Sequence, residues 1–144
     1  MLEKAWVFWC NDSFWLNPIA KLFDEGTRRS LVSVPDSGEG PLRGLLVAYD
    51  SGGVTPGDAY LWLVGQDGLP RAWRMWTQIL PLGGIEASWE GWQSLPNGAR
   101  VATRHRLPIF TLELSDIRAA ASAAELSGGE DPFGPILQAT RPEP

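Results

Sequence analysis

The sequence predicts a mainly β fold of the α+β type: a curved, open antiparallel sheet with one or two helices packed on it. Residues 60–114 read as five consecutive short strands with a turn signal after each of the first four. Apolar and polar residues alternate within these strands, as in a sheet with one wet face. Five of the eight tryptophans also lie in this region. So much aromatic surface must fill a core, line a groove or meet a partner.

The chain before residue 50 predicts three further strands and one short helical turn. The apolar run 5–10 (AWVFWC) fits a buried strand. Asn17-Pro18 then signals a turn or a helix start, and residues 18–23 fit about one helical turn. Of the strands 31–34 and 42–49, the second has apolar residues on both faces, which predicts a central position in the sheet.

The glycine- and proline-rich loop 50–58 leads into the main sheet and lacks the Gly-Lys-Ser/Thr of a phosphate loop. Strand 60–64 is expected to pair with 72–79, because Asp67-Gly68 between them is a strong hairpin signal. Three more strands are predicted at 85–92, 99–106 and 109–114.

Alternation sorts the residues of these strands onto two faces. In the strand 85–92, the apolar set is Ile85, Ala87 and Trp89, and the polar set is Glu86, Ser88 and Glu90. In the next strand, Val101, Thr103 and His105 oppose Ala102, Arg104 and Arg106. One face is therefore predicted to be wet and the other to carry the aromatic residues.

Helix-forming residues replace this pattern after Asp116. The stretch DIRAAASAAEL predicts a helix that Ser115 or Asp116 caps and Gly128 ends. We expect a single sheet domain over residues 1–126 and a loose tail over 127–144, apart from Phe133, Ile136 and Leu137.

Charge and composition exclude several classes of protein. The net charge of −5 argues against nucleic acid as a partner, because phosphate binding needs a basic surface. The one basic run consists of Arg100, Arg104 and Arg106. We expect these arginines to form cross-strand ion pairs on the wet face with Glu86, Glu90 and Glu113. No apolar run is long enough to span a membrane, and the first residues lack the features of a signal peptide. The single cysteine, Cys10, cannot form an internal disulfide.

Several segments together resemble a pattern found in uncharacterised bacterial secreted proteins. They are NDSFWL (11–16), KLFDEG (21–26), VTPGDAY (54–60), GLPRAWRMW (68–76), WEGW (89–92), GAR (98–100) and LELSDI (112–117). Those proteins are similar in strand order to the periplasmic lipoprotein-carrier superfamily, the outer-membrane lipoprotein-sorting proteins. The resemblance covers roughly residues 5–118 and rests on structural rather than catalytic motifs.

The resemblance implies an open, strongly curved sheet that is lidded by helices and holds acyl chains on its concave face. It also implies a periplasmic or other extracytoplasmic location. Full-length members carry a signal sequence and several strands before the segment that matches Ala5. This chain is therefore expected to be the C-terminal part of a longer protein or a truncated relative with an open sheet edge. An open edge invites pairing, so a homodimer is one expectation.

The candidates for chemistry are weak. His105 is the only histidine, and without a nucleophile-elbow pattern it is expected to be packed or at a rim. Cys10 is expected to be a small buried hydrophobe. Glu86 and Glu90 lie four residues apart on a strand, about 13 Å, which is too far for a glycosidase pair. The acids Asp12, Asp24 and Glu25 are spaced too loosely for calcium. We expect no enzyme, no metal and no cofactor.

The tryptophans carry the functional prediction. They are interpreted as plain core, as the lining of an apolar groove, or as a platform that stacks sugars. The groove reading predicts non-catalytic binding of an apolar small molecule or acyl chain, with Trp62, Trp73, Met75, Trp76, Trp89 and Phe110 as its lining. The alternatives are an interaction or structural module that uses the sheet face or open edge, and a carbohydrate-binding domain.

Overall fold

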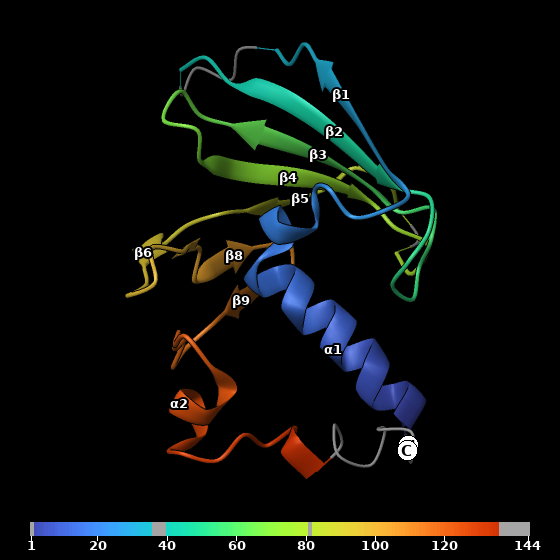
Figure 1. The fold of residues 1–144 in the computed structure, drawn as a ribbon. Coiled ribbons are helices and arrows are strands. Elements are labelled where there is room, and N and C mark those ends of the chain that lie inside the picture. Colours follow the sequence, from blue (N-terminus) through green and yellow to red (C-terminus); the bar gives the residue numbers. More distant parts are fainter. Residues whose placement is uncertain (1, 36–39, 81, 136–144) are drawn as a thin grey trace.

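The structure, a computed structural model, describes residues 2–35, 40–80 and 82–135. It confirms the mainly β fold (Figure 1). A five-stranded antiparallel sheet has the order β1-β2-β3-β4-β5 and is not closed into a barrel. Its strands are β1 (Thr27–Val32), β2 (Arg43–Tyr49), β3 (Ala59–Val64), β4 (Pro70–Trp76) and β5 (Ile85–Ser88).

The sequence signals within this sheet are confirmed. The strand with two apolar faces, β2, lies between β1 and β3. The Asp-Gly turn joins β3 to β4: Gly68 adopts a φ of 80°, and the Asp67 carboxylate accepts a hydrogen bond from the backbone N–H of Leu69 at 3.2 Å. Glycine suits this position because it enters the left-handed region without a Cβ penalty.

The loop between β2 and β3 is fixed by one buried acid. Asp58 is 5% exposed. Its carboxylate accepts hydrogen bonds from the Thr55 hydroxyl at 2.6 Å and from the Gln78 backbone N–H at 2.9 Å. The glycine-rich loop is therefore tied to the chain that leaves β4.

The last strands predicted for the sheet form two small ladders instead. β6 (Gln93–Ser94) pairs with β7 (Arg100–Val101), and β8 (Arg104–Arg106) pairs with β9 (Thr111–Glu113). The predictions of continuous strands at 85–92 and 99–106 are therefore wrong. Gly91, with a φ of 64°, turns the first of them, and a Cβ there would lie 2.5 Å from the Thr103 hydroxyl oxygen. An L side chain at that position would be both strained and crowded.

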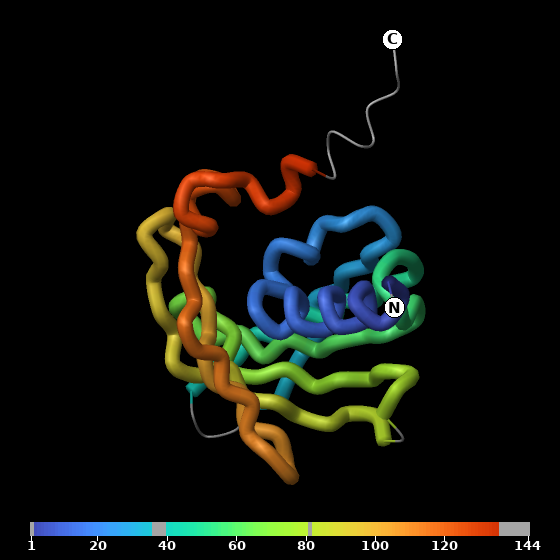
Figure 2. The backbone as a smooth tube through the Cα atoms, turned by 90° about the horizontal axis from the view of Figure 1, so that it is seen from below, coloured from blue at the N-terminus to red at the C-terminus, as the bar shows by residue number. Residues whose placement is uncertain are grey.

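The first segment is a helix rather than the predicted strand over 5–10. α1 (Leu2–Leu16) is followed by the 3-10 helix η1 (Pro18–Lys21), which confirms the short turn expected at Asn17-Pro18. Pro18 lacks an N–H and ends the longer helix. α1 lies on the same side of the sheet as β8 and β9 (Figures 1 and 2). No helix among the described residues has the length and apolar character needed to cross a membrane.

The second helix is shorter than predicted. α2 (Ala123–Ser127) begins seven residues after Asp116, which itself has a φ of 54°. Its cap is Ser122, whose hydroxyl accepts a hydrogen bond from the Glu125 N–H at 3.3 Å. Gly128 ends the helix, as expected, with a φ of 85°. The predicted contacts of Ile136 and Leu137 lie outside the described residues.

The two faces of the sheet differ as the alternation predicts. The core lies on one face and consists of Val47, Tyr60, Trp62, Trp73, Met75, Ala87, Trp89 and Ala102. Cross-strand ion pairs lie on exposed surface: Arg74–Glu86 at 2.9 Å, Arg104–Glu113 at 2.8 Å and Arg106–Glu90 at 2.5 Å. The predicted charge pairing is confirmed for Arg104 and Arg106, whereas Glu86 pairs with Arg74. Exposed pairs of this kind contribute little to stability.

Candidate functional site

Nine rings between residues 14 and 105 form one continuous assembly, here called the aromatic cluster. Its members are Phe14, Trp15, Tyr49, Tyr60, Trp62, Trp73, Trp89, Trp92 and His105. The strands supply one wall, and the C-terminal turn of α1 supplies the other through Phe14 and Trp15.

Trp73 is the centre of the aromatic cluster. Its side chain is 0% exposed. Ring centroids of Phe14, Trp15, Tyr60, Trp62 and Trp89 lie between 4.8 and 5.4 Å from it. Offset and edge-to-face contacts of this kind are worth about 0.5–1.5 kcal/mol each beyond burial.

The structure brings four of the six predicted groove residues together. Trp62, Trp73, Met75 and Trp89 are at most 4% exposed and share the core face of the sheet. Phe14 stacks on Trp73 at 5.4 Å with an interplanar angle of 22°. The predicted groove floor is therefore covered by the end of α1.

The other two predicted groove residues lie elsewhere. Trp76 is three positions after Trp73 on the same strand, and alternation puts the two on opposite faces. Trp76 is 42% exposed and packs beside Gly83, where an added Cβ would lie 2.5 Å from the indole. Phe110 is 53% exposed, just before β9.

An apolar groove does exist, beside the aromatic cluster. It has a volume of about 260 Å³ and is lined by Asn11, Asp12, Trp15, Phe110, Leu112 and Leu114. Only Phe110 of this set was predicted. For Leu112 and Leu114 a signal was present, because residues 110, 112 and 114 alternate along one face of a strand. Trp15 forms the groove wall on one side and contacts Trp73 and His105 on the other.

His105 is enclosed by the aromatic cluster, which confirms a packed histidine. Its Nδ1 lies 3.0 Å from the Ser88 carbonyl oxygen, so the neutral ring carries its proton there, and its Nε2 is buried without a partner among the described residues. The Trp89 ring lies edge-on at 4.4 Å. Burial lowers the pKa of His105, opposed by the Ser88 carbonyl and the charge of Glu90.

We expect this histidine to make stability fall as pH drops below about 6.5, the pKa of histidine in the unfolded chain, and down to the lower folded-state pKa. The folded-state pKa is lower, so as pH falls the unfolded chain takes up the proton first. The stability that neutral His105 contributes is present above about pH 6.5 and is lost below it. Urea unfolding at several pH values measures this slope.

The matched control is His105→Asn, whose amide nitrogen takes the place of Nδ1, so it can still donate to the Ser88 carbonyl but does not titrate. His105 is the only histidine, so the variant should lose the slope in this window. Equal slopes in both proteins would assign the dependence to other groups.

The remaining polar groups in and beside the aromatic cluster are closed off from water. The indole N–H groups of Trp62, Trp73 and Trp89 have no hydrogen-bond partner among the described residues. Trp73 meets Trp62 at 85° and Trp89 at 78°, the edge-to-face arrangement in which a ring face serves as a weak acceptor. Burial, and secondarily the charge of Asp24, raises the pKa of Tyr49 to about 12. The cluster is therefore an apolar environment.

Cys10 and the acidic residues show no clustering for chemistry. Cys10 lies in α1 and is half-buried, so the prediction of a buried strand residue is wrong. Within the described ranges, no three His, Cys, Asp or Glu side chains come together as metal ligands would.

Comparison with protein-family models, with curated proteins and with solved structures finds no match to this chain. The geometry of the aromatic cluster and the adjoining groove therefore stands by itself as the basis for a function.

Proposed function

We propose that this domain binds an apolar, lipid-like molecule without catalysis, in the groove between α1 and β9. The observation that supports it most is the lining: Trp15, Phe110, Leu112 and Leu114 form the walls, and only Asn11 and Asp12 are polar. The volume of about 260 Å³ is just below the usual range for ligand pockets.

Burial is the mechanism of binding in this proposal. Each Å² of apolar ligand surface removed from water contributes about 25 cal/mol. The groove offers no ring of fixed polar groups to read a headgroup, so ligand choice is broad. Trp15 separates the groove from the aromatic cluster, and movement of α1 away from the sheet would extend the apolar surface along Trp73 and its neighbours.

The absence of catalysis is part of the same proposal. A general base must reach its substrate, whereas the His105 ring is 0% exposed and its Nδ1 faces the Ser88 carbonyl. An extracytoplasmic location also belongs to the proposal, through the resemblance to the lipoprotein carriers.

Titration with the fluorescent apolar probe N-phenylnaphthylamine tests the groove. We expect saturable enhancement with the natural chain and at least about tenfold weaker binding by Leu112→Glu, because a buried charge opposes apolar contact. The matched control is Leu31→Glu on β1, where the side chain is 84% exposed and remote from the groove lining. Unchanged binding by Leu112→Glu, with its fold verified by circular dichroism, would overturn the proposal.

An interaction module is the second candidate, and the exposed apolar residues of α1 favour it. The sheet edge at β1 is a weaker surface for this purpose, because Arg28 and Arg29 are both exposed on it and charged residues protect edges from pairing. A carbohydrate platform is not favoured. The exposed tryptophans of the described chain, Trp6, Trp9 and Trp76, lie on two separate elements rather than side by side on the sheet.

A further inference from the structure

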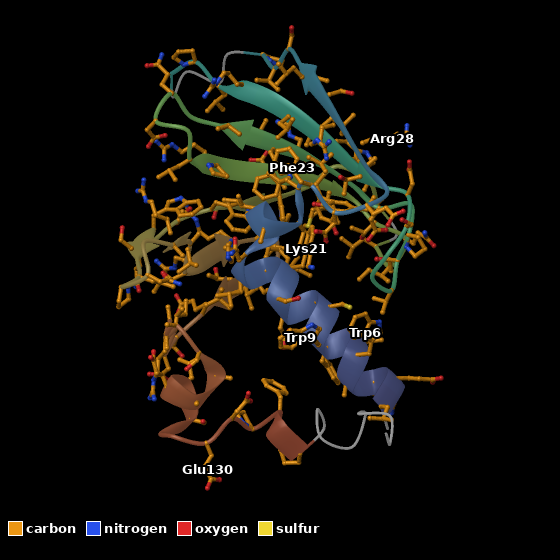
Figure 3. The ribbon with its side chains drawn as sticks, in the orientation of Figure 1. Trp6, Trp9, Lys21, Phe23, Arg28 and Glu130 are labelled. Carbon is orange, nitrogen blue, oxygen red and sulfur yellow. The ribbon has the colours of Figure 1, made fainter. Side chains whose placement is uncertain are left out.

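The N-terminal two-thirds of α1 exposes more apolar surface than any other element of the described chain. None of the helix residues is buried. Leu2 is 88% exposed, Trp6 53%, and Phe8 and Trp9 64% each; Val7 and Leu16 are partly exposed as well. A helix this apolar is normally covered. Figure 3 shows Trp6 and Trp9 on the part of α1 that extends away from the sheet.

The exposed residues are ordered along the helix. Leu2, Trp6, Trp9 and Leu16 are spaced by four, three and seven residues, so they lie along one side of α1. Val7 and Phe8 are exposed too, but they lie more than about 100° around the helix from the middle of this row and do not belong to it. Fifteen residues make a helix of about 22 Å, so the row runs along its whole length.

We propose that α1 is the interface of a homodimer, in which this surface packs against α1 of a second copy. The four residues of the row expose on the order of 500 Å² per chain, since a large aromatic side chain presents ~150–250 Å² when fully exposed. A specific interface buries at least about 1,000 Å² in total, or about 500 Å² per partner, so the row meets the lower end of this range. A two-fold axis lets the same patch cover itself on both copies. Tryptophan is also among the residues that contribute most binding energy at interface centres.

Charge favours a second copy over a lipid surface. α1 carries Glu3 and Asp12 against a single Lys4, and the whole chain has a net charge of −5. Helices that lie in anionic membrane surfaces are rich in Lys and Arg instead. Only three charged residues in fifteen leave little repulsion between two α1 helices.

Charge also favours α1 over the sheet edge as the dimer surface. A two-fold pairing of β1 with β1 of a second copy would bring Arg28 and Arg29 of both chains close together. Like charges opposite one another in a sheet are destabilising. In this homodimer, the partner of the interaction module, the second candidate function, is a second copy of the chain. The proposal does not depend on ligand binding in the groove.

Sedimentation analysis between about 1 and 100 µM, a range in which specific dimers form, tests the interface. We expect the natural chain to approach twice its 15.8 kDa mass. The double variant Trp6→Ser/Trp9→Ser should raise the dissociation constant by at least about 100-fold, because it removes the central aromatic residues from both copies. Both side chains are more than half exposed within the chain, so the monomer should stay folded by circular dichroism. The matched control, Leu31→Ser, changes a still more exposed apolar residue on β1 and should leave the dimer intact.

Three outcomes would overturn the proposal. The first is a natural chain that remains monomeric at the highest concentration. The second is a dimer that survives the α1 variant but is lost in Leu31→Ser, which would place the interface at the sheet edge. The third is a monomer that co-sediments with phosphatidylcholine vesicles through Trp6 and Trp9. The Leu112→Glu variant should remain dimeric, so failure of the groove and failure of the interface are distinguishable.

Discussion

Replacement of Trp73 by alanine is expected to lower the free energy of unfolding by about 3–5 kcal/mol, the usual cost of truncating a buried tryptophan. The indole is fully buried and its centroid lies within 5.4 Å of five other aromatic rings. Truncation leaves a cavity that the neighbouring rings on β3, on α1 and just after β5 cannot all collapse to fill. For a domain whose total stability is about 5–15 kcal/mol, this is a large fraction. Urea unfolding followed by far-UV circular dichroism measures it.

The matched control is Trp76→Ala on the same strand. Trp76 is 42% exposed and lies on the opposite face, so we expect a loss of about 1 kcal/mol, in the ordinary range for a partly exposed side chain. Trp73→Phe should cost less than Trp73→Ala, because it keeps a ring in place and removes an indole N–H that has no partner in the described part of the chain. Equal losses at positions 73 and 76 would mean that the aromatic cluster is not the core.

The central sheet could be predicted because its local signals agree with its tertiary environment. Asp67-Gly68 specifies the β3–β4 hairpin, and the alternation of Ile85, Ala87 and Trp89 gives the correct buried face of β5 and the residue after it. One register follows from such a pattern, because a one-residue slip would expose the whole apolar set. The core position of Trp62, Trp73 and Trp89 follows from the same alternation.

The helix α1 could not be predicted as readily. A run of six apolar residues such as 5–10 fits a buried strand and a helix equally well. The spacing of Leu2, Trp6, Trp9 and Leu16 is helical. Such an apolar row is good evidence for a helix only when another element of the fold buries it. In the described structure nothing buries that row. The local pattern therefore had no tertiary contact to confirm it.

The candidate groove was missed because two elements far apart in sequence build it. Asn11, Asp12 and Trp15 come from α1, whereas Leu112 and Leu114 come from β9 and the residue after it. With the first segment read as a strand, no argument from the sequence could bring these residues together. The prediction that Trp76 lines the same groove as Trp73 was wrong for a different reason. Alternation within β4 already places the two side chains on opposite faces of the sheet.

Loss of the rings that dock α1 is the second large effect that we expect. The double variant Phe14→Ala/Trp15→Ala should lower the free energy of unfolding by about 3–4 kcal/mol, because two half-buried aromatic residues are truncated. Phe14 contacts Tyr49, Tyr60 and Trp73, and Trp15 contacts Trp73 and His105. These are the ring contacts that join α1 to the sheet, so the variant should also expose the buried face of the aromatic cluster. Near-UV circular dichroism and urea unfolding report the two effects.

The matched control is Trp6→Ala/Trp9→Ala, which removes two exposed aromatic residues from the same helix. Measured at about 0.1 µM, where an interface of ordinary micromolar affinity is dissociated, it should change stability by no more than about 0.5 kcal/mol. Both double variants remove two aromatic rings from the same helix and have similar effects on helix propensity. A difference between them therefore isolates the contact between α1 and the sheet. If both double variants lowered the free energy of unfolding equally, Phe14 and Trp15 would not be the residues that hold α1 on the sheet. The groove between α1 and β9 would then have no fixed wall.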